Sequence, residues 1–179
     1  MTNINPTLIH TPSIVRLNTI HTKRNEFINL LHDCVDSGAS IGFIAPLEKN
    51  EAVEYWQSVE TELQSGHRLL LVALEDDNIA GTVQLSLCQK KNGLHRAEVE
   101  KLMVHTAYRQ RGIGKMLMAE LELLAKQHQR SLLVLDTRTH DPASALYRKC
   151  GFTEVGQIPH FALNSSYEYS GTTYFYKLI

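Results

Sequence analysis

The chain has 179 residues, of which 43% are hydrophobic, a length and composition typical of one compact domain with a substantial core. Its 18 Lys and Arg residues nearly balance 19 Asp and Glu residues, so the formal net charge is −1. This balance argues against nonspecific binding to nucleic acid or to an anionic membrane. We therefore expect a single domain over residues 1–179 that binds neither nucleic acid nor a membrane.

Cysteine and histidine spacing argues against a disulfide scaffold and against a metal site. Cys34, Cys88 and Cys150 are odd in number and far apart, which is typical of a reduced intracellular protein. None of the nine histidines recurs at the i, i+4 spacing of helical metal ligands. The first residues lack the pattern of a signal peptide, and no apolar run reaches membrane-spanning length. We expect a cytoplasmic protein without a metal.

Apolar periodicity predicts one strand and two helices in the first part of the chain. Residues 13–17 favour a strand. Phe27, Leu30, Leu31 and Cys34 then recur at helical spacing, as do Val53, Trp56, Val59 and Leu63 farther on. We expect helices over residues 23–36 and 48–64.

The middle of the chain predicts an antiparallel meander. A continuous apolar run over 69–74 is followed by a polar turn at 75–78. Strands over 79–88 and 95–104 flank Asn92-Gly93, a pair favoured in tight hairpin turns.

The last third predicts two helices and three strands. Ile113, Leu117, Leu121 and Leu124 form one apolar helical face. The other expected elements are a strand over 131–135, a polar loop over 136–141, a helix from Pro142 to Gly151, and strands over 153–158 and 173–178. The element order predicts an α/β sandwich with a mixed sheet.

The junction between the strand ending at Val104 and the helix starting near Ile113 is the most informative segment. Arg109-Gln110-Arg111-Gly112-Ile113-Gly114 leads directly into the helix, followed by Lys115 and Met116. Free N–H groups and the helix dipole make such a junction suitable for phosphate, and glycines let the backbone approach it. The basic side chains of Arg109, Arg111 and Lys115 either contact this anion or form a solvated helix start.

Two motifs resemble the GNAT superfamily of acyl-CoA-dependent N-acetyltransferases. Arg109, Gly112 and Gly114 match its cofactor motif, Arg/Gln-x-x-Gly-x-Gly/Ala. A second motif, Ala-x-x-Leu-Tyr-x-x-x-Gly-Phe, is matched by Ala143, Leu146, Tyr147, Gly151 and Phe152. Segments 38–43, 84–90 and 96–99 are further similar to the tabtoxin-resistance type of acetyltransferase, which acetylates a small amino-acid-like toxin.

The resemblance implies a mixed, largely antiparallel sheet of about seven strands, flanked by about four helices, with two central strands splayed apart. It also implies acetyl-CoA as cofactor, threaded between strands 99–104 and 131–135. Backbone groups of Leu102, Met103 and Val104 would hold the pantetheine, with Ala143 and Tyr147 from the later motif. Many members carry Asn where this chain has His140, whose imidazole could also hydrogen-bond the cofactor.

Tyr147 is, by the resemblance, the general acid that protonates the coenzyme A sulfur, and the alternative is an aromatic residue that fills the core. The base is open between Glu98, which aligns with the catalytic glutamate of the histone-acetylating branch, and Asp136, which follows a strand. Glu100 shares a strand face with Glu98 and could bind substrate, as could Asp136. The alternative is that these glutamates are solvated or pair with Lys101.

Two connections are candidates for the acceptor site. Residues 40–47 contain Phe43, and residues 159–171 contain Tyr167; the latter segment is either a substrate-lining loop or an exposed connector. The leading hypothesis is acetyl transfer to a primary amine of a small molecule by a monomer or homodimer. The alternatives are a protein N-terminal or lysine acetyltransferase and a non-catalytic acyl-CoA sensor.

Overall fold

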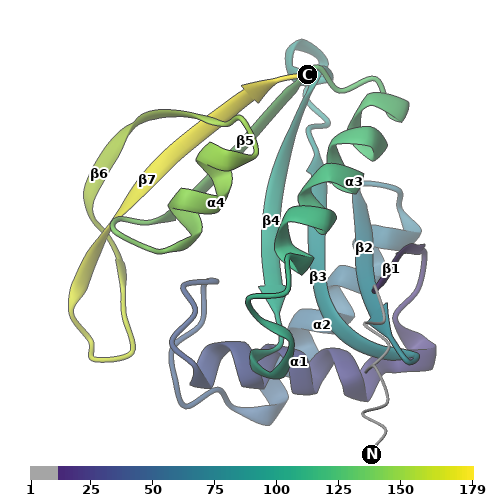
Figure 1. Ribbon diagram of the computed structural model, residues 1–179, viewed down its shortest axis with the longest axis vertical. Coiled ribbons are helices and arrows are strands. Elements are labelled where there is room, and N and C mark those ends of the chain that lie inside the picture. The colour runs from purple at the N-terminus through teal and green to yellow at the C-terminus, as the bar shows by residue number, and fades with distance from the viewer. Residues whose placement is uncertain (1–11) are drawn as a thin grey trace, which may run out of the picture.

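The computed structural model describes residues 12–179, which form one seven-stranded sheet in the order β1-β2-β3-β4-β5-β7-β6 (Figure 1). The strands are β1 (Ser13–Leu17), β2 (Arg68–Glu75), β3 (Asn78–Leu87), β4 (Arg96–Val104), β5 (Leu132–Arg138), β6 (Thr153–Leu163) and β7 (Tyr169–Leu178). The helices are α1 (Arg24–Asp36), α2 (Lys49–Gln64), α3 (Ile113–Gln127) and α4 (Ala143–Lys149).

The sheet is antiparallel except between β4 and β5, which run parallel. A parallel neighbour needs a crossover connection, and α3 supplies it. The expected mixed, largely antiparallel sheet with its flanking helices is therefore confirmed.

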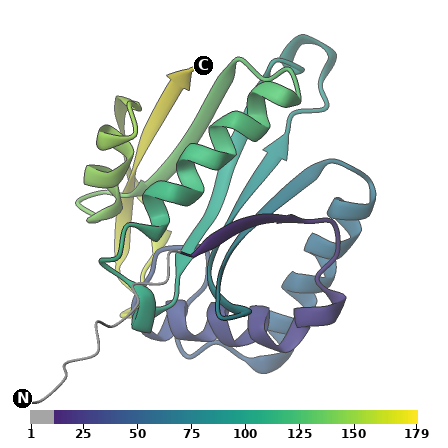
Figure 2. The same cartoon turned by 45° about the vertical axis from the view of Figure 1, so that its right-hand side comes forward.

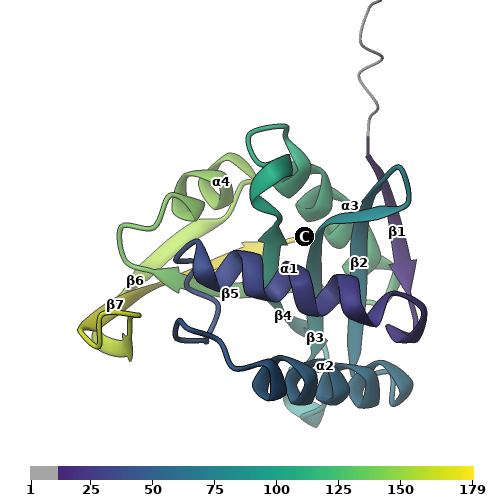
Figure 3. The same ribbon diagram turned by 90° about the horizontal axis from the view of Figure 1, so that it is seen from below.

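Helices cover both faces of the sheet. Figure 3 shows α1 and α2 on one face and α3 and α4 on the other, and Figure 2 shows α3 lying across the strands. Phe27 and Trp56 pack with ring centroids 4.6 Å apart in the α1–α2 core. Ile113 and Leu117 anchor α3 to the opposite core. The apolar stripes read from the sequence thus define the two buried layers.

Strands β4 and β5 separate after a short paired stretch. Residues 96–98 of β4 pair with residues 132–134 of β5, and the two strands do not pair beyond that stretch. Strand β5 continues to pair with β7 as far as Arg138. Figure 1 shows the two groups of strands diverging from the end that carries the C-terminus. The expected splaying of the central strands is confirmed. The later halves of β4 and β5 are no longer paired with each other.

A β-bulge interrupts β4 just beyond this point. Gln84 opposes Glu100 and Thr82 opposes Met103, so β4 contains one more residue than β3 between the two pairs. Lys101 adopts φ +51° there. A bulge shifts the alternation of side chains, and after it Leu102 rather than Lys101 packs on the α3 side of the sheet.

Two expectations about connections are wrong. Asn92-Gly93 forms no two-residue hairpin turn, because a 3₁₀ turn over Lys91–Gly93 joins β3 to β4 and Gly93 packs against Cys88. Residues 159–171 are mostly strand, since β6 and β7 pair almost to their ends. Pro159 is tolerated because β6 is the edge strand and its register is irregular between Ile158 and Ala162.

Candidate functional site

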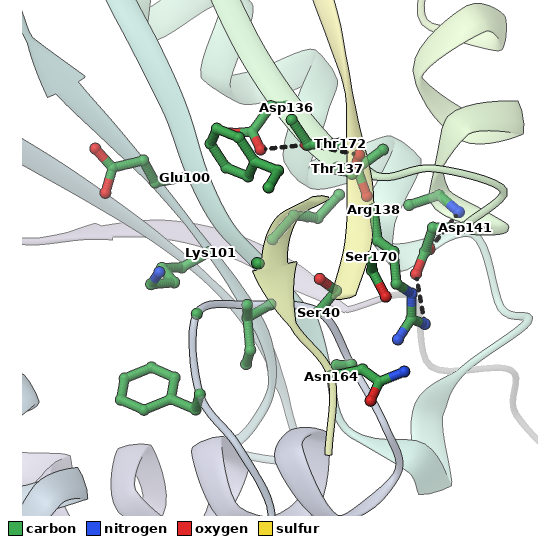
Figure 4. A pocket seen from close by; sticks show the side chains of 18 of the residues that line it. Ser40, Glu100, Lys101, Asp136, Thr137, Arg138, Asp141, Asn164, Ser170 and Thr172 are labelled. Atoms are coloured by element: carbon green, nitrogen blue, oxygen red, sulfur yellow. Dashed lines mark hydrogen bonds and ion pairs between the residues drawn. The ribbon is translucent and has the colours of Figure 1, made fainter. Parts of the chain in front are cut away.

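A cavity of about 670 Å³ lies where β4 and β5 diverge. Its walls come from the α1–α2 connection, from β4 and β5, from the start of α4, and from the β6–β7 hairpin (Figure 4). Residues distant in the sequence meet here because the sheet opens at its centre. The cavity is therefore a product of the topology.

Most of the side chains expected to act in catalysis or acceptor binding meet in this cavity. The residues from the sequence hypothesis that line it are Phe43, Glu98, Glu100, Leu102, Asp136, Ala143 and Tyr147. His140 instead lies at a second cavity of about 420 Å³ beside β6. Tyr167 lies in the β6–β7 turn, outside both cavities, and is 71% exposed, although Asn164 and Ser165 of the same turn line the first cavity. The segment thus lines the cavity without the Tyr167 side chain, and contact of Tyr167 with a substrate stays a prediction.

Glu98 and Asp136 face the cavity from adjacent strands. Glu98 opposes Val134 in the parallel ladder, so Asp136, two residues farther along β5, lies on the same face as Glu98. Asp136 lies within β5, not in the polar loop expected from the sequence, and accepts a hydrogen bond from Thr172 Oγ1 at 2.6 Å (Figure 4). Burial raises the pKa of Glu98, and the nearby charges of Glu100 and Asp136 raise it further. Glu98 is thus suited to accept a proton more readily than an ordinary glutamate does.

Glu100 is held by an arginine that the sequence hypothesis did not include. Arg68 on β2 is 2.8 Å from the Glu100 carboxylate and also forms an ion pair with Glu62. Arg68 further donates to Gln84, which hydrogen-bonds with Tyr55. The partner of Glu100 is therefore Arg68 and not Lys101, the alternative considered from the sequence.

Lys101 reaches the cavity through the β4 bulge. Its Nζ lies 5.7 Å from the ring centroid of Phe43 and 5.8 Å from that of Tyr55. Burial lowers the pKa of Lys101, while the charge of Glu100 acts in the opposite direction. The sequence gives no sign of this position, because no glycine or proline marks the bulge.

Tyr147 both fills the core and lines the cavity. Its ring centroid lies 5.9 Å from that of Phe175 and 6.2 Å from that of Phe152, and the residue is 8% exposed. Burial raises the pKa of Tyr147, and the charges of Asp141 and Asp136 add to the effect. The phenol therefore holds its proton throughout the neutral range.

Asp141 orients the start of the helix that carries Tyr147. It accepts a hydrogen bond from the N–H of Ala143 at 2.9 Å and pairs with Arg138 at 3.1 Å. Neither Asp141 nor Arg138 is among the site residues expected from the sequence. Their spacing beside Pro142, with an acidic residue before a helix start, is a capping signal that could have indicated them.

The start of α3 leaves a row of backbone donors free. Among residues 12–179, no acceptor pairs with the N–H groups from Gln110 to Lys115. Gly112 precedes the helix with φ +79°, a conformation that favours glycine. Glycine is favoured at position 114 for a different reason, because a Cβ there would lie only 3.2 Å from Leu146 Cδ2. The row of free donors fits a diphosphate.

The basic side chains near these amides have partners within the protein. Arg109 donates to the Val104 carbonyl at 3.0 Å and to Ser37 Oγ at 2.7 Å. Arg111 pairs with Glu75 at 2.7 Å. Both side chains therefore have intramolecular partners, and their contact with a phosphate stays a prediction.

Met103 and Val104 offer the cavity no side chain. Met103 is 1% exposed in the α1–α2 core, and Val104 packs toward α3. Any contact of these two residues with a ligand would have to use the backbone, as the sequence hypothesis stated.

In the described part of the chain, no metal-ligand cluster of His, Cys, Asp or Glu occurs, and no helix is long and apolar enough to cross a bilayer.

Comparison with known proteins identifies the family. Residues 30–152 match the model of the acetyltransferase (GNAT) family. A ribosomal-protein-alanine N-acetyltransferase from Brucella melitensis superposes with a TM-score of 0.78 at 20% identity, covering 92% of this chain and 99% of that one. A candidate acetyltransferase from Salmonella typhimurium with its cofactor acetyl-CoA gives 0.74 at 16% identity, covering 94% of each chain.

A candidate phosphinothricin N-acetyltransferase gives a TM-score of 0.72 at 21% identity and covers 93% of this chain and 99% of that one. These identities establish a shared fold, whereas the family model spans more than half of the sequence. The chain belongs to the acetyltransferase (GNAT) family and is an N-acetyltransferase whose cofactor is acetyl-CoA.

Proposed function

We propose that this single-domain enzyme acetylates the primary amine of a small molecule, such as an amino-acid-like toxin or antibiotic. The observation that carries the proposal is the cavity between β4 and β5, whose volume of about 670 Å³ is typical of small-molecule sites. The Ala45 N–H donates to Ser165 Oγ at 3.1 Å, which joins the α1–α2 connection to the β6–β7 turn. Such a closed wall favours a small acceptor over a protein chain. We expect the enzyme to act in the cytoplasm as a monomer or homodimer.

The residues present fit acetyl-CoA, which supplies the activated acetyl thioester. The N–H groups from Gln110 to Lys115 would hold the diphosphate at the start of α3. The backbone of β4 from Leu102 to Val104 would hold the pantetheine, with Ala143 on the opposite wall of the cavity. The free donors and the separated strands support this assignment.

Glu98 is the proposed general base. An amine must be neutral to attack, and the raised pKa of Glu98 lets its carboxylate take a proton from an ammonium more readily than an ordinary glutamate would. Asp136 is the alternative base, but its hydrogen bond from Thr172 occupies one carboxylate oxygen. We therefore assign Asp136 to holding the acceptor amine beside Glu98.

Tyr147 is the proposed general acid. Its buried phenol carries a proton at Oη and lines the cavity opposite β4. A departing thiolate needs a proton, and a phenol held in its neutral form can provide it. Its packing against Phe175 fixes the ring for this role.

An acceptor panel tests the proposal. Purified enzyme is incubated with acetyl-CoA and free amino acids, phosphinothricin, polyamines, or peptides that begin with alanine, and thiol release is followed with product mass. We expect turnover with a small amine and a loss of about 100-fold or more in kcat for Tyr147→Phe. Tyr176→Phe is the matched control, because Tyr176 lies on β7 outside the cavity.

The outcomes separate the alternatives. Turnover confined to peptides would replace the small acceptor with a protein N-terminus. Equal kcat values for wild type and Tyr147→Phe would remove the acid assignment. Binding of acetyl-CoA without acetylation of any amine would contradict the proposed reaction.

A further inference from the structure

Lys101 is a cation directed into the cavity by an unusual backbone position. The β4 bulge and φ +51° at Lys101 place its side chain on the face of the sheet that carries α2, beside Glu100. A nonglycine residue at positive φ is strained, and such strain is concentrated at functional sites. The backbone thus departs from regular strand geometry at the point where an ammonium enters the site.

The surroundings of Lys101 are built for a charge, but the carboxylates near it, those of Glu100, Asp136 and Glu98, form no direct ion pair with its ammonium. The rings of Phe43 and Tyr55 lie within cation–π range of Nζ, and Gly42 leaves room for it, since a Cβ there would lie 3.2 Å from Nζ. Within residues 12–179, no ion pair or hydrogen bond to the Lys101 ammonium occurs. A half-buried ammonium without a direct ion-pair partner is costly, and an anionic ligand would lower that cost.

The other charges that line the cavity divide into paired and available groups. Glu100 pairs with Arg68, and Asp141 pairs with Arg138. The carboxylates of Glu98 and Asp136 form no ion pair with any described residue, and Lys101 is the cavity-lining cation without an ion-pair partner among the same residues. The free charges therefore consist of two acids on adjacent strands and one ammonium at the bulge.

We propose that Lys101 Nζ binds a carboxylate, or an equivalent anionic group, on the acceptor whose amine lies at Glu98 and Asp136. The enzyme then selects amino-acid-like molecules over simple amines, because only the former complement both charges. This inference rests on the proposed function and names its substrate class. Burial of Lys101, which lowers its pKa, agrees with a site that gains its anion from a ligand.

Matched acceptors test the inference in the wild-type enzyme. L-Methionine, L-methioninamide and 3-(methylthio)propylamine share a side chain and an amine but differ in the carboxylate, and L-lysine, L-lysinamide and cadaverine form a second series. We expect kcat/KM to fall at least about 30-fold when the carboxylate is removed, mainly through KM. Equal kcat/KM across both series would overturn the role of Lys101 while leaving the proposed acetyl transfer intact.

Two variants locate the effect. Lys101→Met should raise KM for the carboxylate acceptor at least about 30-fold and leave KM for the amide within about twofold, whereas Lys101→Arg should recover part of the loss. Lys49→Met, an exposed lysine at the start of α2, is the matched control. An equal rise in KM for acid and amide in Lys101→Met would indicate a merely structural role and overturn the inference.

A binding measurement separates this inference from the proposed function. Calorimetry in the presence of coenzyme A compares N-acetyl-L-methionine with N-acetyl-L-methioninamide, which need no turnover. Tighter binding of the acid, lost in Lys101→Met, supports the inference even if no amine is acetylated. Equal binding of acid and amide to the wild type contradicts it. Coenzyme A affinity in each variant reports whether the fold is intact.

Discussion

Replacing Arg68 with Met removes the cation that holds Glu100 and should destabilise the protein by about 2–3 kcal/mol. The Arg68 side chain is 11% exposed and that of Glu100 is 26% exposed, so their pair is neither a surface pair nor fully buried. Surface pairs contribute about 0–1 kcal/mol, and breaking a buried pair costs about 3–5 kcal/mol, which brackets the expected value. For a chain of this size, the melting temperature should fall by about 4–12 °C.

Thermal and urea denaturation followed by circular dichroism would measure this loss. Glu62→Gln is the control, because Glu62 is 44% exposed and its loss should cost less than about 1 kcal/mol. Arg68→Met/Glu100→Met should regain part of the stability, since it also removes the carboxylate left without a partner. A change below about 0.5 kcal/mol in Arg68→Met would refute the view that this arginine neutralises a partly buried acid.

The other predictions concern the base and the cofactor amides. Glu98→Gln should lower kcat/KM about 100-fold or more. Wild-type activity should fall as pH drops through the raised pKa of Glu98, because the base must be deprotonated, and this limb should vanish in the variant; an unchanged pH profile would exclude Glu98 as base. Gly112→Ala should cost about 1 kcal/mol of stability and weaken coenzyme A binding in calorimetry. Gly66→Ala introduces the same positive-φ strain away from α3 and should leave affinity unchanged, so equal affinities in both variants would argue against the amide site.

The helices were predictable because their burial depends on local periodicity. Phe27, Trp56 and Leu117 occupy the apolar stripes read from the sequence, and each is fully buried in one of the two cores. The divergence of β4 and β5 was expected only because of the resemblance to the GNAT family. No residue pattern in either strand shows where the pairing of β4 with β5 ends, because that point depends on the pairing of β7 with β5.

Features that depend on distant partners could not be predicted. The partner of Arg111 is Glu75, and one partner of Arg109 is Ser37; both lie far away in the sequence. Residues 159–171 contain a proline, a glycine and many polar side chains, a composition typical of a loop. Their pairing as an edge hairpin is possible because an edge strand exposes one side to solvent and tolerates irregular register.

The role of Arg68 extends beyond stability, because it decides which charges in the cavity remain available. Arg68 does not line the cavity, but it is the ion-pair partner of Glu100. Without Arg68, the Glu100 carboxylate would lose this partner, and Lys101 is the next residue in the chain. In Arg68→Met we therefore expect Glu100 to compete for the Lys101 ammonium and to raise KM for a carboxylate acceptor, while KM for the matching amide stays constant. Arg68→Met/Glu100→Gln should return KM toward the wild-type value. If the double variant kept the raised KM, the loss would lie in the packing of β2 and β4 rather than in competition between two anions for one lysine.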